Sequence, residues 1–198
     1  MLTHTVTFFI LGTNAVSAMF KGGSAHCREN NNGWPFMSGS APMRLTERNF
    51  NTDSQNRNLT KCVSAVRVSA DERSHILEQN ITYFNESSKT WISFQKNFSA
   101  AAWGTYNLDI NFFWASGPGG INLTYYVLHA ERDCLVTKLL YRRSGKGSAC
   151  EIWVTDDYFE RRSVCCDYFY HISCEKTQQI LYEREECSEM EKYQKGNR

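Results

Sequence analysis

Residues 105–130, TYNLDINFFW ASGPGG INLTYYVLHA, contain two strand-like runs on either side of a turn. Aromatic and β-branched residues dominate the runs at 105–114 and 121–130, and these residue types favour an extended chain. The stretch 115–120 between the runs contains proline and three glycines, which is typical of a tight connection. Because short connections join antiparallel neighbours, this part of the chain is predicted to form a β-hairpin.

The same alternation of strand-like runs and short polar turns continues on both sides of this hairpin. Eight antiparallel strands close most economically into an up-and-down barrel, which leaves no sheet edge exposed. A sandwich of the immunoglobulin kind is the alternative, but it would show a Cys–Trp–Cys framework and longer crossing loops. We therefore expect an all-β chain that forms an eight-stranded antiparallel barrel. The expected strands are 42–51, 61–69, 75–84, 90–98, 105–114, 121–130, 134–141 and 150–155.

Asn-x-Ser/Thr sequons predict which face of each strand points outward. A glycan cannot occupy a barrel interior, and side chains alternate between the two faces of a strand. If Asn80, Asn97 and Asn122 point outward, the intervening residues form a largely apolar and aromatic interior, and an eight-stranded barrel has room for one small ligand. The predicted glycosylation sites are Asn58, Asn80, Asn85, Asn97 and Asn122. The predicted inward residues are Leu77, Gln79, Ile81, Tyr83, Ile92, Phe94, Lys96, Phe98, Ile121, Leu123, Tyr125, Val127 and His129.

After Thr155 the period changes from that of a strand to that of a helix. Residues 156–174 begin with two aspartates and carry apolar residues near helical spacing, so we expect one helix that lies outside the barrel. The following segment, 175–187, is expected to be extended and to return along the barrel. The charged end from Ser188 onward is expected to be loose.

The N-terminus and the cysteines indicate a secreted protein. Residues 1–18 contain a short apolar run followed by small residues, which predicts a signal peptide that leaves one domain over 19–198. An even number of cysteines behind such a leader predicts four disulfides, whereas the spacing does not match a zinc site, so no metal is expected. The formal net charge of +1 favours neither nucleic acid nor membrane as a partner. The cysteines are Cys27, Cys62, Cys134, Cys150, Cys165, Cys166, Cys174 and Cys187.

Cys165 and Cys166 are adjacent in the expected helix. Neighbouring helical side chains differ in direction by about 100 degrees, so these two cysteines should reach different partners. The residues alone leave the pairing open, because eight cysteines allow about 105 arrangements. No motif positions a catalytic nucleophile, so we expect neither an enzyme nor a cofactor.

The cysteine-bearing motifs resemble those of the salivary lipocalins of ticks, which include the histamine-binding proteins. The resemblance is carried by CLV at 134–136, CEIWV at 150–154 and the later cysteines, and GPGGINLTYYVLHAERDCLV (117–136) is most similar to hard-tick forms. It implies a lipocalin barrel with a C-terminal helix packed outside. It also implies the pairs Cys27–Cys165, Cys134–Cys166, Cys62–Cys187 and Cys150–Cys174, in which Cys165 and Cys166 are interchangeable.

Amine-binding members of that family share a pattern of three parts separated by gaps. The parts are Cys-Asp-(Val/Ile/Leu), then Glu-Leu-(Trp/Tyr), then Cys. Here Leu135 replaces the aspartate, and Glu151-Ile152-Trp153 and Cys165 match the remainder. The resemblance makes Glu151 and Trp153 candidate ligand-binding residues. An arginine such as Arg142 or Arg143 is the alternative partner for Glu151, and core packing is the alternative role for Trp153. Further candidate ligand-binding residues are Tyr125, Asp109 and Trp114.

The resemblance implies a secreted protein that sequesters a small host mediator, a biogenic amine such as histamine or serotonin. Because Leu135 removes one carboxylate, a lipid mediator or a sterol is the alternative ligand. Lys96 and Arg67 could meet a carboxylate-bearing lipid if they point inward, although a solvated role is expected for both. A second class of function is binding of a host immune protein through the barrel surface.

Overall fold

The computed structural model of the protein describes residues 27–50, 60–104, 108–116, 122–144, 147–174, 176 and 179–196. The predicted signal peptide, the sequon Asn58 and the expected inward residue Ile121 lie outside these ranges.

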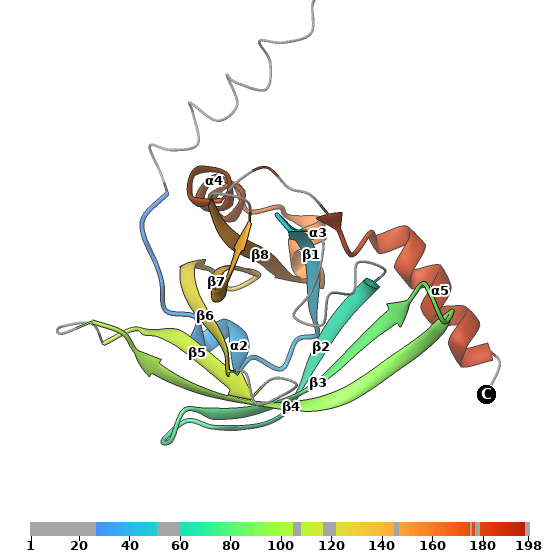
Figure 1. Ribbon diagram of the computed structural model, residues 1–198, viewed down its shortest axis with the longest axis horizontal. Coiled ribbons are helices and arrows are strands. Elements are labelled where there is room, and N and C mark those ends of the chain that lie inside the picture. Colours follow the sequence, from blue (N-terminus) through green and yellow to red (C-terminus); the bar gives the residue numbers. More distant parts are fainter. Residues whose placement is uncertain are drawn as a thin grey trace, which may run out of the picture.

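The described chain forms a closed antiparallel β-barrel (Figure 1). From β2 to β8 each strand pairs with the next along the chain, and β1 pairs with both β8 and β2, which closes the wall. The expected eight-stranded antiparallel barrel is therefore confirmed. The strands are β1 (Met43–Arg48), β2 (Thr60–Asp71), β3 (Ile76–Asn85), β4 (Thr90–Ala102), β5 (Ile110–Ser116), β6 (Asn122–Ala130), β7 (Cys134–Ser144) and β8 (Gly147–Thr155).

One end of the barrel is closed by α2 (Trp34–Met37), a short helix that the sequence analysis did not predict. The amide of Gly33 donates a hydrogen bond of 2.8 Å to the carbonyl of Ile110, and all of α2 except Pro35 is buried. A Cβ atom at Gly33 would lie 2.7 Å from Val127 Cγ2 and 3.0 Å from Phe113 Cε2. Glycine therefore permits the close approach of α2 to β5 and β6.

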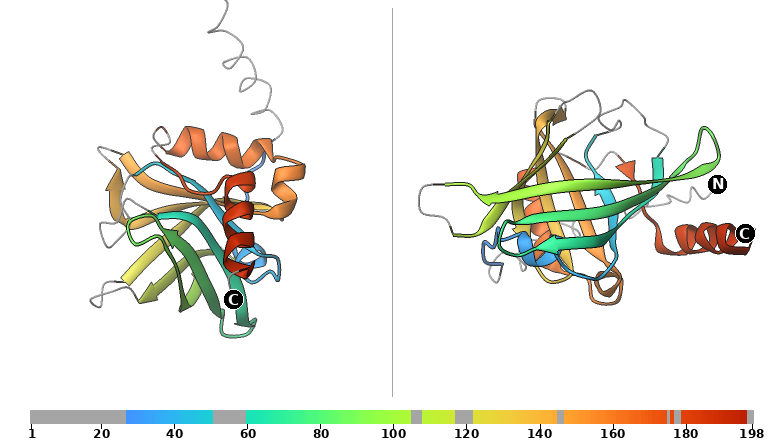
Figure 2. Two further views of the ribbon diagram at one scale, coloured as in Figure 1. Left: turned by 90° about the vertical axis from the view of Figure 1, so that its right-hand side faces the viewer. Right: turned by 90° about the horizontal axis from the view of Figure 1, so that it is seen from below.

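The segment after β8 forms two helices instead of one, α3 (Asp156–Glu160) and α4 (Val164–Ser173). Ser163 separates them, because its side chain accepts a hydrogen bond of 3.2 Å from the amide of Cys165 and caps α4. Figure 2 shows α4 lying outside the barrel wall, as expected. Its buried face packs against β6, β7 and β8 through Cys166 and Tyr170.

His129 does not point into the barrel as the alternation predicted. A register shift between Val127 and His129 on β6 turns this residue to the outer face. There its ring stacks on Phe169 of α4, with 4.2 Å between ring centroids.

Four disulfides join the described cysteines in the arrangement that the family resemblance implied: Cys27–Cys165, Cys62–Cys187, Cys134–Cys166 and Cys150–Cys174. The adjacent cysteines thus serve two partners. Cys165 fixes the N-terminal segment to α4, and Cys166 fixes α4 to the start of β7.

The C-terminal segment differs in part from the expectation. Its first part is extended, as predicted, and includes β9 (Gln179–Ile180), which pairs with the end of β1. The charged end is not loose, because residues Arg184–Gly196 form the helix α5 beside the barrel (Figure 2). Cys187 anchors this helix to β2.

Candidate ligand-binding cavity

The barrel interior contains two adjacent chambers. The inner chamber lies against α2, and the centres of water-sized molecules can occupy about 50 Å³ of it. The outer chamber extends away from α2, with about 120 Å³ of such space. Roughly 10–15 Å³ suffices for one water molecule, so both chambers can hold ligand groups larger than water.

Apolar and aromatic side chains make up most of the wall of both chambers. The residues that line both, and therefore form the boundary between them, are Ile81, Lys96, Tyr125 and Trp153. The inner chamber is further lined by Met37, Met43, Gln79, Phe98, Phe113, Leu135 and Thr137. The outer chamber is further lined by Leu45, Arg48, Phe50, Thr60, Val63, Tyr83, Phe94, Leu123 and Glu151.

Lys96 is the charged residue at this boundary. Its Nζ atom lies 5.2 Å from the centre of the Phe98 ring and 5.8 Å from that of Tyr125, within the range of a cation–π contact. Burial lowers the pKa of Lys96 to about 8, and the negative charge of Glu151 opposes that shift. The ammonium group is thus removed from water without full compensation.

Glu151 and Arg48 are the other charged residues of the outer chamber. They face each other across the pairing of β8 and β1, and only 7% of Glu151 and 3% of Arg48 is exposed. Glu151 accepts a hydrogen bond of 3.2 Å from the indole nitrogen of Trp153. Arg48 donates one of 2.8 Å to the side-chain amide of Gln179 and lies over the Phe50 ring.

The described lining side chains therefore carry two positive charges and one negative charge. Within the inner chamber, no described lining residue is an aspartate or a glutamate. Thr137 lines this chamber and is only 4% exposed, and its buried hydroxyl has no hydrogen-bond partner among the described residues.

The sequence model of one protein family, described as "Tick histamine binding protein", matches residues 24–189. The chain belongs to the tick histamine-binding protein family. Among solved structures, it is similar to Japanin from Rhipicephalus appendiculatus bound to cholesterol, with a TM-score of 0.53 and 14% identity over 75% of this chain and 96% of that one. It is also similar to the cockroach allergen Per a 4, with a TM-score of 0.49 and 12% identity over 78% and 93%. No curated protein sequence matches it.

In this member of the histamine-binding family, the candidate residues from the sequence do not all meet in the cavity. Trp153 and Tyr125 line both chambers, and Glu151 lines the outer one. Asp109 lies exposed before β5 and lines neither chamber. Trp114 lies on the outer face of β5 beside Phe112, because the alternation of this strand turns Phe113 inward.

The position where the family pattern has an aspartate lies within the inner chamber. Leu135 is buried there, opposite Trp153 of β8. The side chains of Arg142 and Arg143, the alternative partners of Glu151, lie outside what the structure describes. Arg67 lines neither chamber, is exposed, and donates a hydrogen bond to the carbonyl of Ser38.

Lys96 and Arg48 were not identified as site residues from the sequence. Strand alternation did place Lys96 inside, but its charge favoured a solvated role. Nothing in the sequence marked Arg48 as a ligand-site residue beyond its position in a predicted strand. Both become site residues because Glu151, far away in the sequence, lies near them in the folded barrel.

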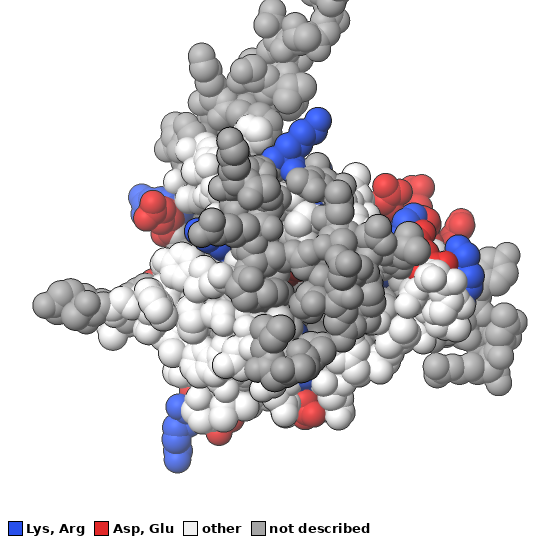
Figure 3. All heavy atoms as spheres, viewed as in Figure 1, with Lys and Arg blue, Asp and Glu red and all other residues white. Residues whose placement is uncertain are grey.

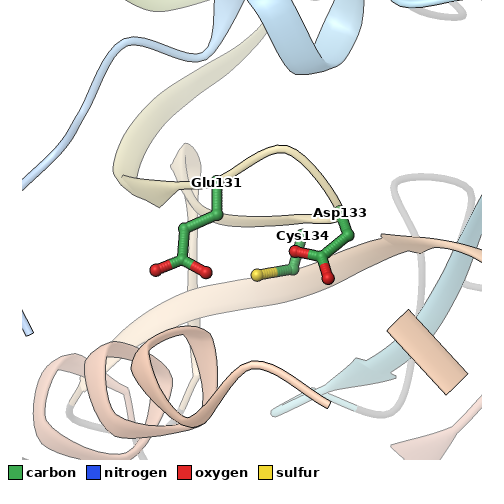
Figure 4. A group of neighbouring side chains, drawn as sticks. All are labelled: Glu131, Asp133 and Cys134. Carbon is green, nitrogen blue, oxygen red and sulfur yellow. The ribbon is translucent and has the colours of Figure 1, made fainter. Parts of the chain in front are cut away.

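One further cluster lies outside the barrel, where Glu131, Asp133 and Cys134 approach one another near the start of β7 (Figure 4). Cys134 is bonded to Cys166, so it offers no thiolate to a metal. Glu131 accepts a hydrogen bond of 2.6 Å from Ser163 and one of 3.3 Å from His129, when Nε2 carries the proton. The cluster therefore serves to fix α4 to the barrel.

The described residues on the face shown in Figure 3 give no strong signal for a charged partner. On the face shown in Figure 3, acidic and basic side chains lie interspersed near its edges. Asn97 and Asn122 are exposed, while Asn80 and Asn85 are partly exposed. Among the described residues, the helices are too short or too polar to span a bilayer.

Proposed function

We propose that this protein is a secreted lipocalin that sequesters a small host mediator inside its barrel and thereby modulates host defence. The observation that supports it best is the two-chambered cavity, closed by α2 and lined mainly by apolar and aromatic groups. Such a cavity binds by removing ligand surface from water, with no chemical step. The leader-like N-terminus, the four disulfides and the exposed sequons support secretion and glycosylation.

Within this function, the inner chamber favours an apolar or amphipathic mediator over a biogenic amine. The ammonium group of an amine loses its hydration on entry and needs a carboxylate in return. None of the described residues lining the inner chamber supplies one, and Lys96 would repel the incoming cation. The cholesterol bound to Japanin, a structure of similar fold, is in line with an apolar ligand.

A biogenic amine such as histamine or serotonin is the second candidate, and it depends on Glu151 and Trp153. The carboxylate of Glu151 and the indole of Trp153 are hydrogen-bonded to each other beside the outer chamber. Together they could hold an ammonium group by charge and by the aromatic face. Arg48 and Lys96 weaken this arrangement, because both positive charges are attracted to the carboxylate of Glu151.

The test is a calorimetric titration of the glycosylated, oxidised protein with histamine, serotonin and cholesterol. We expect saturable binding of cholesterol and at least about tenfold weaker binding of either amine. Glu151→Gln should leave the affinity for cholesterol unchanged. The matched control is Glu78→Gln, on the outer face of β3. Tight amine binding that Glu151→Gln abolishes would establish the second candidate instead. Failure of all small ligands would direct attention to a host protein bound at the surface.

A further inference from the structure

We propose that the sugar attached to Asn97 packs on an aromatic strip outside the barrel, on the outer face of β4 and β5. The inference goes beyond the carrier function and rests only on the proposed secretion, because sequons receive N-glycans in secreted chains. It assigns a role to large apolar side chains that line neither chamber of the cavity.

Three aromatic side chains form the aromatic strip. The ring of Trp103, which is 60% exposed, stacks on Phe112 with 4.8 Å between centroids, and Phe112 lies 5.7 Å from Trp114. Phe112 and Trp114 are themselves partly exposed. Strand β4 beside them lies on the side of the barrel opposite α4 (Figure 1). Contiguous apolar surface on a soluble protein marks a contact with another group, so the strip calls for an occupant.

The strand register places a sequon directly beside the strip. Ser99 is the hydroxyl residue of the sequon that begins at Asn97, and it pairs with Trp114 of β5. Phe98 between them is buried and lines the cavity, so Asn97 and Ser99 both point outward. A residue two positions along an adjacent strand lies about 7–8 Å away on the diagonal, so a sugar on Asn97 reaches the ring of Trp114.

The outer side chains of β4 leave room for a sugar ring beside the strip. Ser99 and Ala101, which pair with Trp114 and Phe112, are both small. On its other side Ser99 pairs with Ile76 of β3, which is 48% exposed. The outer face of β4 therefore carries small side chains between larger apolar ones, and the sequon asparagine precedes them on the same face.

The chemistry of the first sugar of an N-glycan suits this surface. N-acetylglucosamine presents C–H groups on the faces of its ring, and such groups are attracted to the negative face of an aromatic ring. Its hydroxyl groups stay at the ring edge, where water solvates them. Because the sugar is covalently attached to Asn97, the contact is intramolecular and benefits from a high effective concentration.

The sequon at Asn122 and a second copy of the chain are the competing occupants. Asn122 lies on the β6 side of Trp114, but there the large side chain of Tyr126 pairs with Phe112. A second copy would have to approach between the predicted glycans at Asn97 and Asn122, which are both exposed. Bulky glycans on either side of Trp114 would keep a protein surface away from the strip.

The experiment uses the full oxidised chain, secreted from cells that attach high-mannose glycans, with each glycan then trimmed enzymatically to its first N-acetylglucosamine. Mass spectrometry measures site occupancy, and thermal unfolding measures stability. We expect Asn97 to carry the sugar, and Asn97→Gln to lower the melting temperature by roughly 2–4 °C. The matched control is Ser87→Ala, which removes the sequon at Asn85. Because the strand neighbours of Asn85 are Thr60 and Thr90 instead of aromatic residues, this control should leave the melting temperature unchanged.

A second readout separates a sugar contact from the loss of the asparagine side chain itself. In a double-mutant cycle, the effect of Asn97→Gln should disappear in the background of Trp114→Thr. It should persist in the background of Trp114→Phe, which keeps an aromatic ring. Ser99→Ala, which keeps Asn97 but removes its sequon, should lower the melting temperature as much as Asn97→Gln does.

An Asn97 that carries no sugar, or an Asn97→Gln effect of equal size in the Trp114→Thr background, would overturn the inference. A concentration-dependent dimer that Trp114→Thr disrupts would overturn it as well, in favour of a second copy as the occupant. The carrier function is tested separately, by titrating the same secreted protein with cholesterol, so either proposal can fail while the other holds.

Discussion

The backbone amide of Cys62 donates a hydrogen bond of 2.6 Å to the carbonyl of Leu181. The amide of Leu181 in turn donates one of 2.8 Å to Thr46 on β1. At this level β1 no longer pairs with β2, since their direct pairing is confined to Met43 and Arg44. The C-terminal segment therefore completes the barrel wall between the two strands. Its Leu181 side chain is 1% exposed and packs with Leu45, Val63 and Tyr83.

Leu181→Ala should therefore destabilise the barrel. Removing a buried leucine side chain costs about 2–5 kcal/mol, and urea-induced unfolding followed by tryptophan fluorescence would measure the loss. The matched control is Ile180→Ala, because Ile180 is next to Leu181 in the chain but 55% exposed, and it should change the free energy of unfolding by less than about 0.5 kcal/mol. Equal losses in the two variants would show that Leu181 does not fill the wall.

The Cys62–Cys187 disulfide should contribute more stability than Cys150–Cys174. The first bridge spans 125 residues and the second spans 24, and closing a longer loop removes more entropy from the unfolded chain. Replacing both cysteines of a bridge by alanine should cost about 1.5 kcal/mol more for the longer loop. Differential scanning calorimetry of the two double variants tests this order, and a larger loss for Cys150/Cys174 would reverse it.

Lys96→Met should stabilise the ligand-free protein at neutral pH. Burial lowers the pKa of Lys96 to about 8, against 10.5 for the unperturbed side chain, so the folded state binds this proton less readily than the unfolded state. The cost is complete below pH 8 and disappears as the pH rises from about 8 to about 10.5. At pH 7 the variant should gain roughly 2–3 kcal/mol of unfolding free energy. A gain that persists unchanged at pH 10, or a loss at pH 7, would contradict this account.

Mild acid should weaken the contact between α4 and the barrel through His129. Burial lowers the pKa of this imidazole, and the hydrogen bond to Glu131 opposes the shift only in part. Because the folded-state pKa lies below the unfolded value, stability is lost as the pH falls below about 6.5 toward the folded-state pKa. His129→Phe, which keeps an aromatic ring against Phe169, should show a smaller fall in melting temperature between pH 7 and pH 5. His171→Phe, on the exposed face of α4, should behave like the unaltered protein.

The barrel could be predicted from sequence because local patterns determine most of its strands. Alternation of side chains, anchored by outward sequons, correctly placed Leu77, Gln79 and Tyr83 in the interior of β3. The alternation failed at His129, since the register shift that turns this residue outward depends on how β6 pairs with β7. That pairing has no separate signal in the residues around it.

The helices and the C-terminal segment show a second limit of prediction from sequence. Ser163 is a favoured N-cap residue, so the break between α3 and α4 was readable from the sequence. The position of Leu181 in the barrel wall could not be predicted, because it depends on a gap between β1 and β2 that exists only in the folded barrel. The charged α5 was missed because a mainly polar pattern predicts solvent exposure and says little about conformation.

The candidate site was predictable where the family pattern names its residues and where strand alternation placed Tyr125 inside. Glu151 and Trp153 were found from the family pattern, and both line the cavity. Lys96 was placed correctly by alternation but assigned to solvent by its charge, because its aromatic and acidic neighbours come from other strands. Asp109 was chosen for its carboxylate alone, and carboxylates are common at exposed positions.

The disulfide arrangement also constrains the order of events during biosynthesis. Of the eight cysteines, Cys27 and Cys62 leave the ribosome first, yet their partners Cys165 and Cys187 follow 138 and 125 residues later. Both thiols must stay unpaired, or be released from incorrect bridges, until their partners have been synthesised. Maturation of this barrel should therefore be sensitive to thiol exchange, and a chain that ends before Cys187 would carry an unpaired Cys62.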